Sequence, residues 1–141
     1  MLKSLENSYH VSDKQKKDLQ NFVFLIKKNQ EKVNLIGKST INKIWSRHVI
    51  DSLQIIKYLP DQNKNKFMLD VGTGAGFPGV VLSIMGIKNI LLCEKSYKKA
   101  EFLRTVIKKT SLETVVYNCK VEEIFRDNIR IIVSRAYASI K

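Results

Sequence analysis

The stretch LDVGTGAGFPG, residues 69–79, decides how this sequence folds. It carries four glycines within eight residues, directly after the short apolar run 67–71. They are Gly72, Gly74, Gly76 and Gly79. Glycine lets a backbone turn sharply and lets a ligand approach it closely. The stretch therefore predicts a buried strand, a ligand-binding turn and a helix that begins near Pro78, where a missing N–H is tolerated.

The same alternation continues downstream of this turn. Apolar runs predict further strands at 90–93, 114–117 and 129–133. Helical periodicity predicts helices at 78–85 and 96–109 and a short helical turn at 121–125. Strands that alternate with helices imply a parallel sheet built by right-handed crossovers, so the fold class is α/β.

The chain before this unit is predicted to be helical. One amphipathic helix spans 12–29, with Ser12 or Asp13 as its cap, and a second runs from Ile41 until Pro60 ends it. Thr40 or Ser39 is the expected N-cap of the second helix. The polar connection 61–66 then separates a helical segment, 1–65, from an α/β core, 66–141.

A carboxylate at the end of the second strand indicates a nucleoside ligand. Glu94 follows the first glycine of the turn by about twenty residues, the spacing at which an acid accepts hydrogen bonds from ribose hydroxyls. A nicotinamide dinucleotide and S-adenosylmethionine both satisfy this pattern. Asp70, just before Gly72, favours S-adenosylmethionine, because a carboxylate there repels a pyrophosphate and suits an ammonium and a sulfonium.

Four ordered segments resemble one family, the bacterial ribosomal-RNA guanine-N7 methyltransferases, also called the glucose-inhibited division protein B family. The first is DVGTGAGFPG, residues 70–79. The others are Asn34-Leu35 followed by RHVIDSL (47–53), KAEFLR (99–104) and SRAYAS (134–139). The resemblance implies a Rossmann-like S-adenosylmethionine-dependent methyltransferase fold behind an N-terminal helical extension.

The resemblance also implies which residues contact S-adenosylmethionine. Together with the loop and the acid discussed above, the expected cofactor-binding residues are Asp70, Gly72, Gly74, Gly76, Phe77, Glu94, Val121, Glu122 and Arg135. No residue is expected to act as a general base, because guanine N7 carries an exposed lone pair. His48, Asp51 and Arg135 are candidates to line the site, although a lone histidine on an apolar helix stripe is equally compatible with a core position.

The resemblance implies methyl transfer to a guanine of 16S rRNA in the small ribosomal subunit, by a protein that is monomeric when complete. Family members continue past SRAYAS with three more strands, so we expect an incomplete sheet of the first four strands. A catalytically inactive fragment of that enzyme is therefore one alternative, and a nicotinamide-dinucleotide-dependent oxidoreductase is another.

Composition agrees with a polyanionic partner. The 141 residues contain 25 Lys and Arg against 13 Asp and Glu, a formal net charge of +12. Lysines crowd the predicted helix 96–109, which predicts either an RNA phosphate track or a solvated face. The start of the chain lacks the apolar block of a signal peptide, no segment has the apolar length of a membrane span, and the two cysteines indicate neither a disulfide framework nor a metal site. We therefore expect a cytoplasmic protein without membrane contact.

Overall fold

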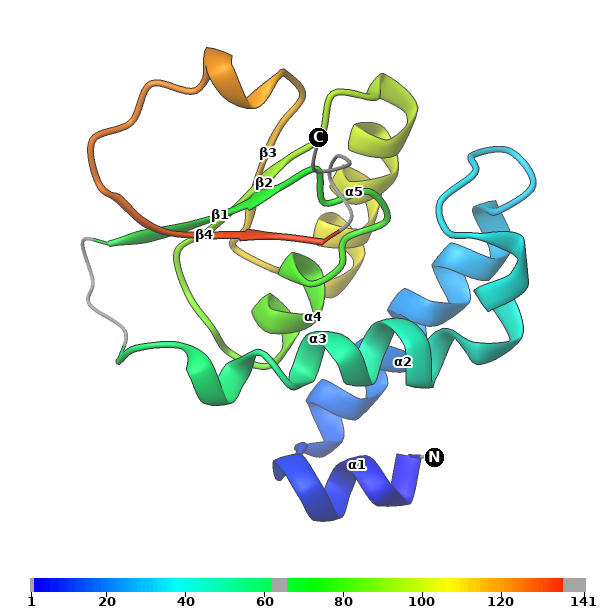
Figure 1. The fold of residues 1–141 in the computed structure, drawn as a ribbon. Coiled ribbons are helices and arrows are strands. Elements are labelled where there is room, and N and C mark those ends of the chain that lie inside the picture. The colour runs from blue at the N-terminus through cyan, green and yellow to red at the C-terminus, as the bar shows by residue number, and fades with distance from the viewer. Residues whose placement is uncertain (1, 62–65, 136–141) are drawn as a thin grey trace.

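The computed structural model describes residues 2–61 and 66–135. It confirms the α/β class: four parallel strands form one sheet in the order β3-β2-β1-β4 (Figure 1). The strands are β1 (Phe67–Val71), β2 (Ile90–Cys93), β3 (Val115–Tyr117) and β4 (Ile129–Ser134). Chain connections run to opposite sides of β1, so the carboxyl ends of β1 and β4 flank the crevice where α/β sheets bind ligands.

Helices cover one face of this sheet. The helices α4 (Gly79–Ile84) and α5 (Tyr97–Thr110) follow β1 and β2, and they share a core with Met68 and Leu92. The opposite face buries Leu69, Val71, Leu91 and Cys93 beneath the β3–β4 connection, which contains the 3₁₀ turn η4 (Val121–Glu123). Side chains that alternate along β1 therefore enter two separate apolar layers.

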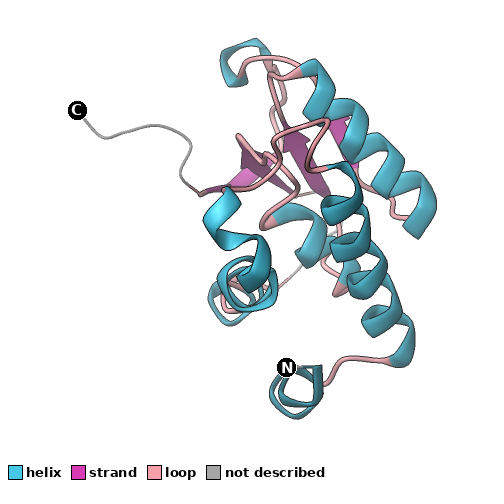
Figure 2. Cartoon of the chain, turned by 90° about the vertical axis from the view of Figure 1, so that its right-hand side faces the viewer, coloured by secondary structure: helices cyan, strands magenta, loops and turns pink. Residues whose placement is uncertain are grey.

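Two helices open the chain. The predicted helix is α2 (Asp13–Asn29), and Ser12 caps it through a reciprocal box with Gln15. The helix α1 (Leu2–Tyr9) was not predicted, and Figure 2 shows it at the end of the molecule away from the sheet. A salt bridge of 2.5 Å between Lys16 Nζ and Glu6 Oε1 ties α1 to α2.

The second predicted helix is present as an irregular helical run. It comprises the 3₁₀ helix η1 (Lys38–Lys43), the π-helical turn η2 (Trp45–Ile50), α3 (Asp51–Leu53) and the 3₁₀ turn η3 (Ile56–Tyr58). The predicted N-cap at Thr40 or Ser39 is wrong, because the run starts at Lys38 and its cap position is Gly37, two to three residues earlier. The Thr40 hydroxyl instead donates to the Gly37 carbonyl at 2.7 Å.

The helical part and the sheet part share one core. Phe22 and Ile26 of α2 and Val49 and Leu53 of the helical run are fully buried with Val80 of α4. Of the predicted connection 61–66, residues 62–65 lie outside the described residues, as do the last six residues of the chain. None of the helices in 2–61 and 66–135 has the length and apolar character required to span a bilayer.

Candidate functional site

The glycine-rich turn lies at the carboxyl end of β1, beside the end of β2. The backbone N–H groups of Gly72 and Thr73 both donate to the Cys93 carbonyl, at 2.9 and 3.1 Å. These bonds hold the start of the turn against β2. The turn then leads into α4 at Gly79.

Asp70 fastens both ends of this turn from inside the fold. Its Oδ2 accepts from the Thr73 hydroxyl at 2.6 Å and from the Gly79 N–H at 2.8 Å. The Gly79 backbone packs so closely that an added Cβ would lie 2.3 Å from Leu92 Cδ2 and 2.7 Å from Asp70 Oδ2. Gly79 thus serves close packing of α4 on the sheet rather than ligand approach.

The carboxyl group of Asp70 is fully buried, with no exposed surface. Burial raises its pKa to about 7, against the opposing effect of its bonds to Thr73 and Gly79. Its Oδ1 has no hydrogen-bond partner within the described residues. Asp70 therefore shapes the turn from inside the fold, and it does not line either pocket described below.

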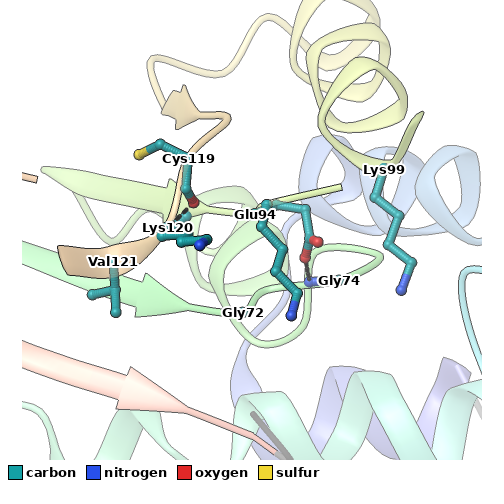
Figure 3. Close-up of a pocket in the computed structure, with 9 residues that line it drawn as sticks. Gly72, Gly74, Glu94, Lys99, Cys119, Lys120 and Val121 are labelled. Atoms are coloured by element: carbon teal, nitrogen blue, oxygen red, sulfur yellow. Dashed lines mark hydrogen bonds between the residues drawn. The ribbon is translucent and has the colours of Figure 1, made fainter. Parts of the chain in front are cut away.

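The first pocket, which we call the strand-side pocket, lies between the turn and the end of β3 (Figure 3). Its lining residues are Gly72, Gly74, Cys93, Glu94, Lys95, Lys99, Cys119, Lys120 and Val121. Glu94 is the acid in this pocket: Oε2 accepts from the Gly74 N–H at 2.9 Å and Oε1 accepts from the Ser96 N–H at 3.0 Å. The structure thus places the acid at the end of β2 directly against the glycine turn.

The second pocket, the helix-side pocket, lies on the other side of the turn, and the two pockets share Gly72, Gly74 and Lys99. Its remaining lining residues are Leu35, Ile36, Gly37, His48, Thr73, Ala75, Phe77 and Arg135. The His48 ring stacks on Phe77 at 5.0 Å between ring centroids and at 25° between planes. The Arg135 guanidinium lies 5.4 Å from the same Phe77 ring. Residues from both halves of the chain therefore form this pocket.

Most of the predicted site residues converge on these two pockets. Gly72, Gly74, Phe77, Glu94, Val121, His48 and Arg135 line one or both of them. Gly76 is a buried residue of the turn, whereas Asp51 and Glu122 are exposed. None of these three residues lines either pocket.

Sequence reasoning missed one wall of the helix-side pocket, the loop Leu35–Gly37. The side chain of Gln30 holds this loop: its Oε1 accepts from the Leu35 and Ile36 N–H groups, and its Nε2 donates to the Ile36 carbonyl at 2.7 Å. The match of Asn34-Leu35 to the family was the available signal for this loop in the sequence. The position of the loop beside the glycine turn depends on the packing of α2.

Comparison with known proteins identifies the family of the chain. The family model described as rRNA small subunit methyltransferase G matches residues 15–141. The chain belongs to the rRNA small subunit methyltransferase G family. Membership confirms the resemblance drawn from the four segments and favours a methyltransferase over a dinucleotide-dependent oxidoreductase.

Curated relatives in this family carry the same name. The chain is 37% identical to the "Ribosomal RNA small subunit methyltransferase G" of Cereibacter sphaeroides (strain ATCC 17029), over 99% of the chain and 68% of the relative. Identity to the protein of that name from Orientia tsutsugamushi is 35%, over 96% and 67%, and to that from Rickettsia prowazekii 38%, over 86% and 62%. The chain thus spans about two thirds of the length of these family members.

Proposed function

We propose that the protein binds S-adenosylmethionine and takes part in transfer of its methyl group to N7 of a guanine in 16S rRNA. The contact of Glu94 with the glycine turn carries the cofactor part of this proposal. A carboxylate at the end of β2, opposite the Gly74 N–H, suits a nucleoside whose ribose hydroxyls donate to the acid. The adenine edge would lie toward Val121, at the far wall of the strand-side pocket.

The chemistry of the lining side chains supports an acceptor atom that needs no base. Among the described lining residues, the one carboxylate and the one imidazole are both engaged: Glu94 accepts two backbone N–H groups, and both ring nitrogens of His48 have partners. Burial raises the pKa of Cys93 to about 11, so this thiol stays protonated at neutral pH. Guanine N7 presents a lone pair and requires no proton removal, so catalysis reduces to alignment of nitrogen, methyl and sulfur.

The cofactor assignment predicts a clear ligand preference. Isothermal calorimetry should detect binding of S-adenosylmethionine or S-adenosylhomocysteine and no comparable binding of NAD. Glu94→Gln should weaken binding at least tenfold, because it removes the charge that accepts the ribose hydroxyls and disturbs the bonds to Gly74 and Ser96. Glu31→Gln, at an exposed acid of the helical part, is the matched control and should bind as the unmodified protein does. Tighter binding of NAD than of either adenosyl ligand would contradict the proposal.

The lysine-rich surface along α5, which reaches the strand-side pocket at Lys95 and Lys99, supports the RNA part of the proposal. Five lysines lie on α5 or directly before it: Lys95, Lys98, Lys99, Lys108 and Lys109. Within the described part of the chain none of them forms a salt bridge, while Arg104 on the same helix pairs with Glu101. Tyr97 starts α5 with 67% of its surface exposed, beside Lys95 and Lys98. An exposed aromatic ring among unpaired cations suits an unstacked base and its flanking phosphates.

A matched pair of surfaces tests this RNA contact. Lys98→Gln with Lys108→Gln should weaken binding of 16S rRNA and reduce the salt slope by roughly 0.7–0.9 per lost phosphate contact. Tyr97→Ala should weaken it further by the loss of one stacking contact, roughly 1–3 kcal/mol. The controls are Lys57→Gln with Lys66→Gln, and Tyr58→Ala, at a residue of the turn η3 that is 76% exposed. Filter-binding titrations over a salt series measure both sets of variants. If the control variants weakened RNA binding as much as the α5 variants did, α5 would be an ordinary solvent-exposed surface.

A further inference from the structure

A chain of hydrogen bonds links the end of β4 to the helical part through His48. Arg135 Nη2 lies 2.6 Å from His48 Nδ1, and His48 Nε2 lies 2.8 Å from the Thr40 hydroxyl. That hydroxyl donates to the Gly37 carbonyl at 2.7 Å. The first and last members, Arg135 and Gly37, both line the helix-side pocket.

The donors in this chain determine the tautomer of His48. A guanidinium has only N–H donors, so His48 Nδ1 must be unprotonated and must accept from Arg135. A neutral imidazole then carries its proton on Nε2, which donates to Thr40 Oγ1. Thr40 has one hydroxyl proton, and it is directed to the Gly37 carbonyl. Every bond in the chain therefore runs in one direction and requires neutral His48.

His48 is also held firmly in place. Its side chain belongs to the π-helical turn η2, it is 9% exposed, and its ring stacks on the buried Phe77. Arg135 makes a second bond, from Nη1 to the Arg47 carbonyl at 3.3 Å. Within the described residues these two bonds use two of the five guanidinium N–H donors, so the others remain available to a ligand in the pocket.

We propose that His48 is a positioning residue: in its Nε2–H form it orients the Arg135 guanidinium toward the helix-side pocket and links it to the loop 35–37, which forms one wall of that pocket. This inference rests on the proposed function only for the identity of the ligand that Arg135 meets. It assigns the helical part a role in the site, beyond packing against the sheet.

The charges around His48 make this arrangement sensitive to acid. Burial lowers the pKa of His48, and the cations Arg135 and Arg47 lower it further, while Asp51 alone raises it. A protonated imidazole would direct an N–H at the guanidinium, so the bond between them is lost and the two cations repel. Acid should therefore release Arg135 at a pH below the ordinary range for histidine.

The tautomer can be tested without any ligand. Long-range nitrogen–proton NMR spectra should show His48 as the Nε2–H tautomer, with a pKa below the ordinary value for a histidine side chain. Arg135→Met should raise the pKa of His48, because it removes both the donor and a neighbouring cation. An Nδ1–H tautomer, or a His48 pKa at or above the ordinary value for histidine, would overturn the proposal whatever the protein binds.

Two substitutions separate positioning from packing. His48→Asn places an amide oxygen near the position of Nδ1 and can still accept from Arg135, whereas His48→Gln places its amide near Nε2 and can reach Thr40 only. Both remove the ring that stacks on Phe77 and both remove the titrating group. We expect S-adenosylhomocysteine affinity at neutral pH to fall at least tenfold in His48→Gln and at least threefold less in His48→Asn.

The pH dependence of S-adenosylhomocysteine affinity supplies the second readout. In the unmodified protein the affinity for S-adenosylhomocysteine should decline on acidification, at a pH below the ordinary pKa of a histidine, and this decline should be absent in both variants. If both variants lost the same affinity and still showed the decline on acidification, His48 would serve packing alone. If the unmodified protein binds no adenosyl ligand, the proposed cofactor is wrong, and the NMR tautomer and the response to Arg135→Met still decide the role of His48.

Discussion

Gly76→Ala should destabilise the protein through both its backbone conformation and the packing around the added methyl group. Gly76 has a φ of +112°, and an added Cβ would lie 2.6 Å from Val80 Cγ2, 3.0 Å from Val80 Cβ and 3.1 Å from Phe22 Cζ. Val80 and Phe22 are fully buried, and valine is short and stiff, so neither can move aside. Overpacking costs about 1–3 kcal/mol and an L-residue in left-handed backbone about 1–2 kcal/mol, so we expect a loss of roughly 2–5 kcal/mol.

Gly86→Ala is the matched control for this change. Gly86 also has a positive φ, +94°, but an added Cβ there meets nothing within 4 Å. The free energy of unfolding of this variant should fall by only the cost of the backbone conformation, about 1–2 kcal/mol. Urea denaturation of both variants measures the difference. Equal losses of stability would show that the structure accommodates a methyl group at Gly76 without a packing cost.

The stability of the protein should fall as pH rises from about 5 to about 8, because of Asp70. The pKa of this carboxyl is raised from 3.8 to about 7 by burial, so the folded protein holds a proton that the unfolded chain has already released. The stabilising contribution of that proton is fully present below the unfolded pKa and is lost as pH rises through the folded pKa. At about 1.4 kcal/mol per unit, the loss between about pH 5 and pH 8 is roughly 2–3 kcal/mol.

Asp70→Asn isolates this contribution from the other charges of a strongly basic chain. The amide oxygen of the variant can accept from Thr73 and Gly79 as Oδ2 does, and its NH₂ takes the place of Oδ1, which has no hydrogen-bond partner within the described residues. The variant cannot titrate, so its free energy of unfolding should change by roughly 2–3 kcal/mol less over the same pH range. Parallel pH dependences in the two proteins would mean that Asp70 is ionised throughout.

Elements with a clear hydrophobic period were predictable from the sequence. The apolar runs predicted all four strands to within a residue at each end, and Ser12, one of the two predicted caps, does cap α2. The helix α1 escaped prediction because Leu5 is its one deeply buried side chain in the described set, and a single anchor has no period. The second helix was predicted, but its irregular hydrogen bonding over 38–58 was not, because an apolar stripe does not distinguish 3₁₀, α and π hydrogen bonding.

The glycine turn and its acid were determined by the sequence alone, because spacing along one strand–turn–helix unit fixes how its residues meet. That local rule placed Gly72, Gly74 and Glu94 at one pocket. The helix-side pocket was decided only by tertiary structure. His48 and Arg135 are 87 positions apart, and their 2.6 Å contact exists because the helical run packs across the end of β4. A sequence shows that each side chain can donate or accept, whereas only packing settles which donor faces which acceptor, and here that choice fixes both the tautomer of His48 and the direction of Arg135.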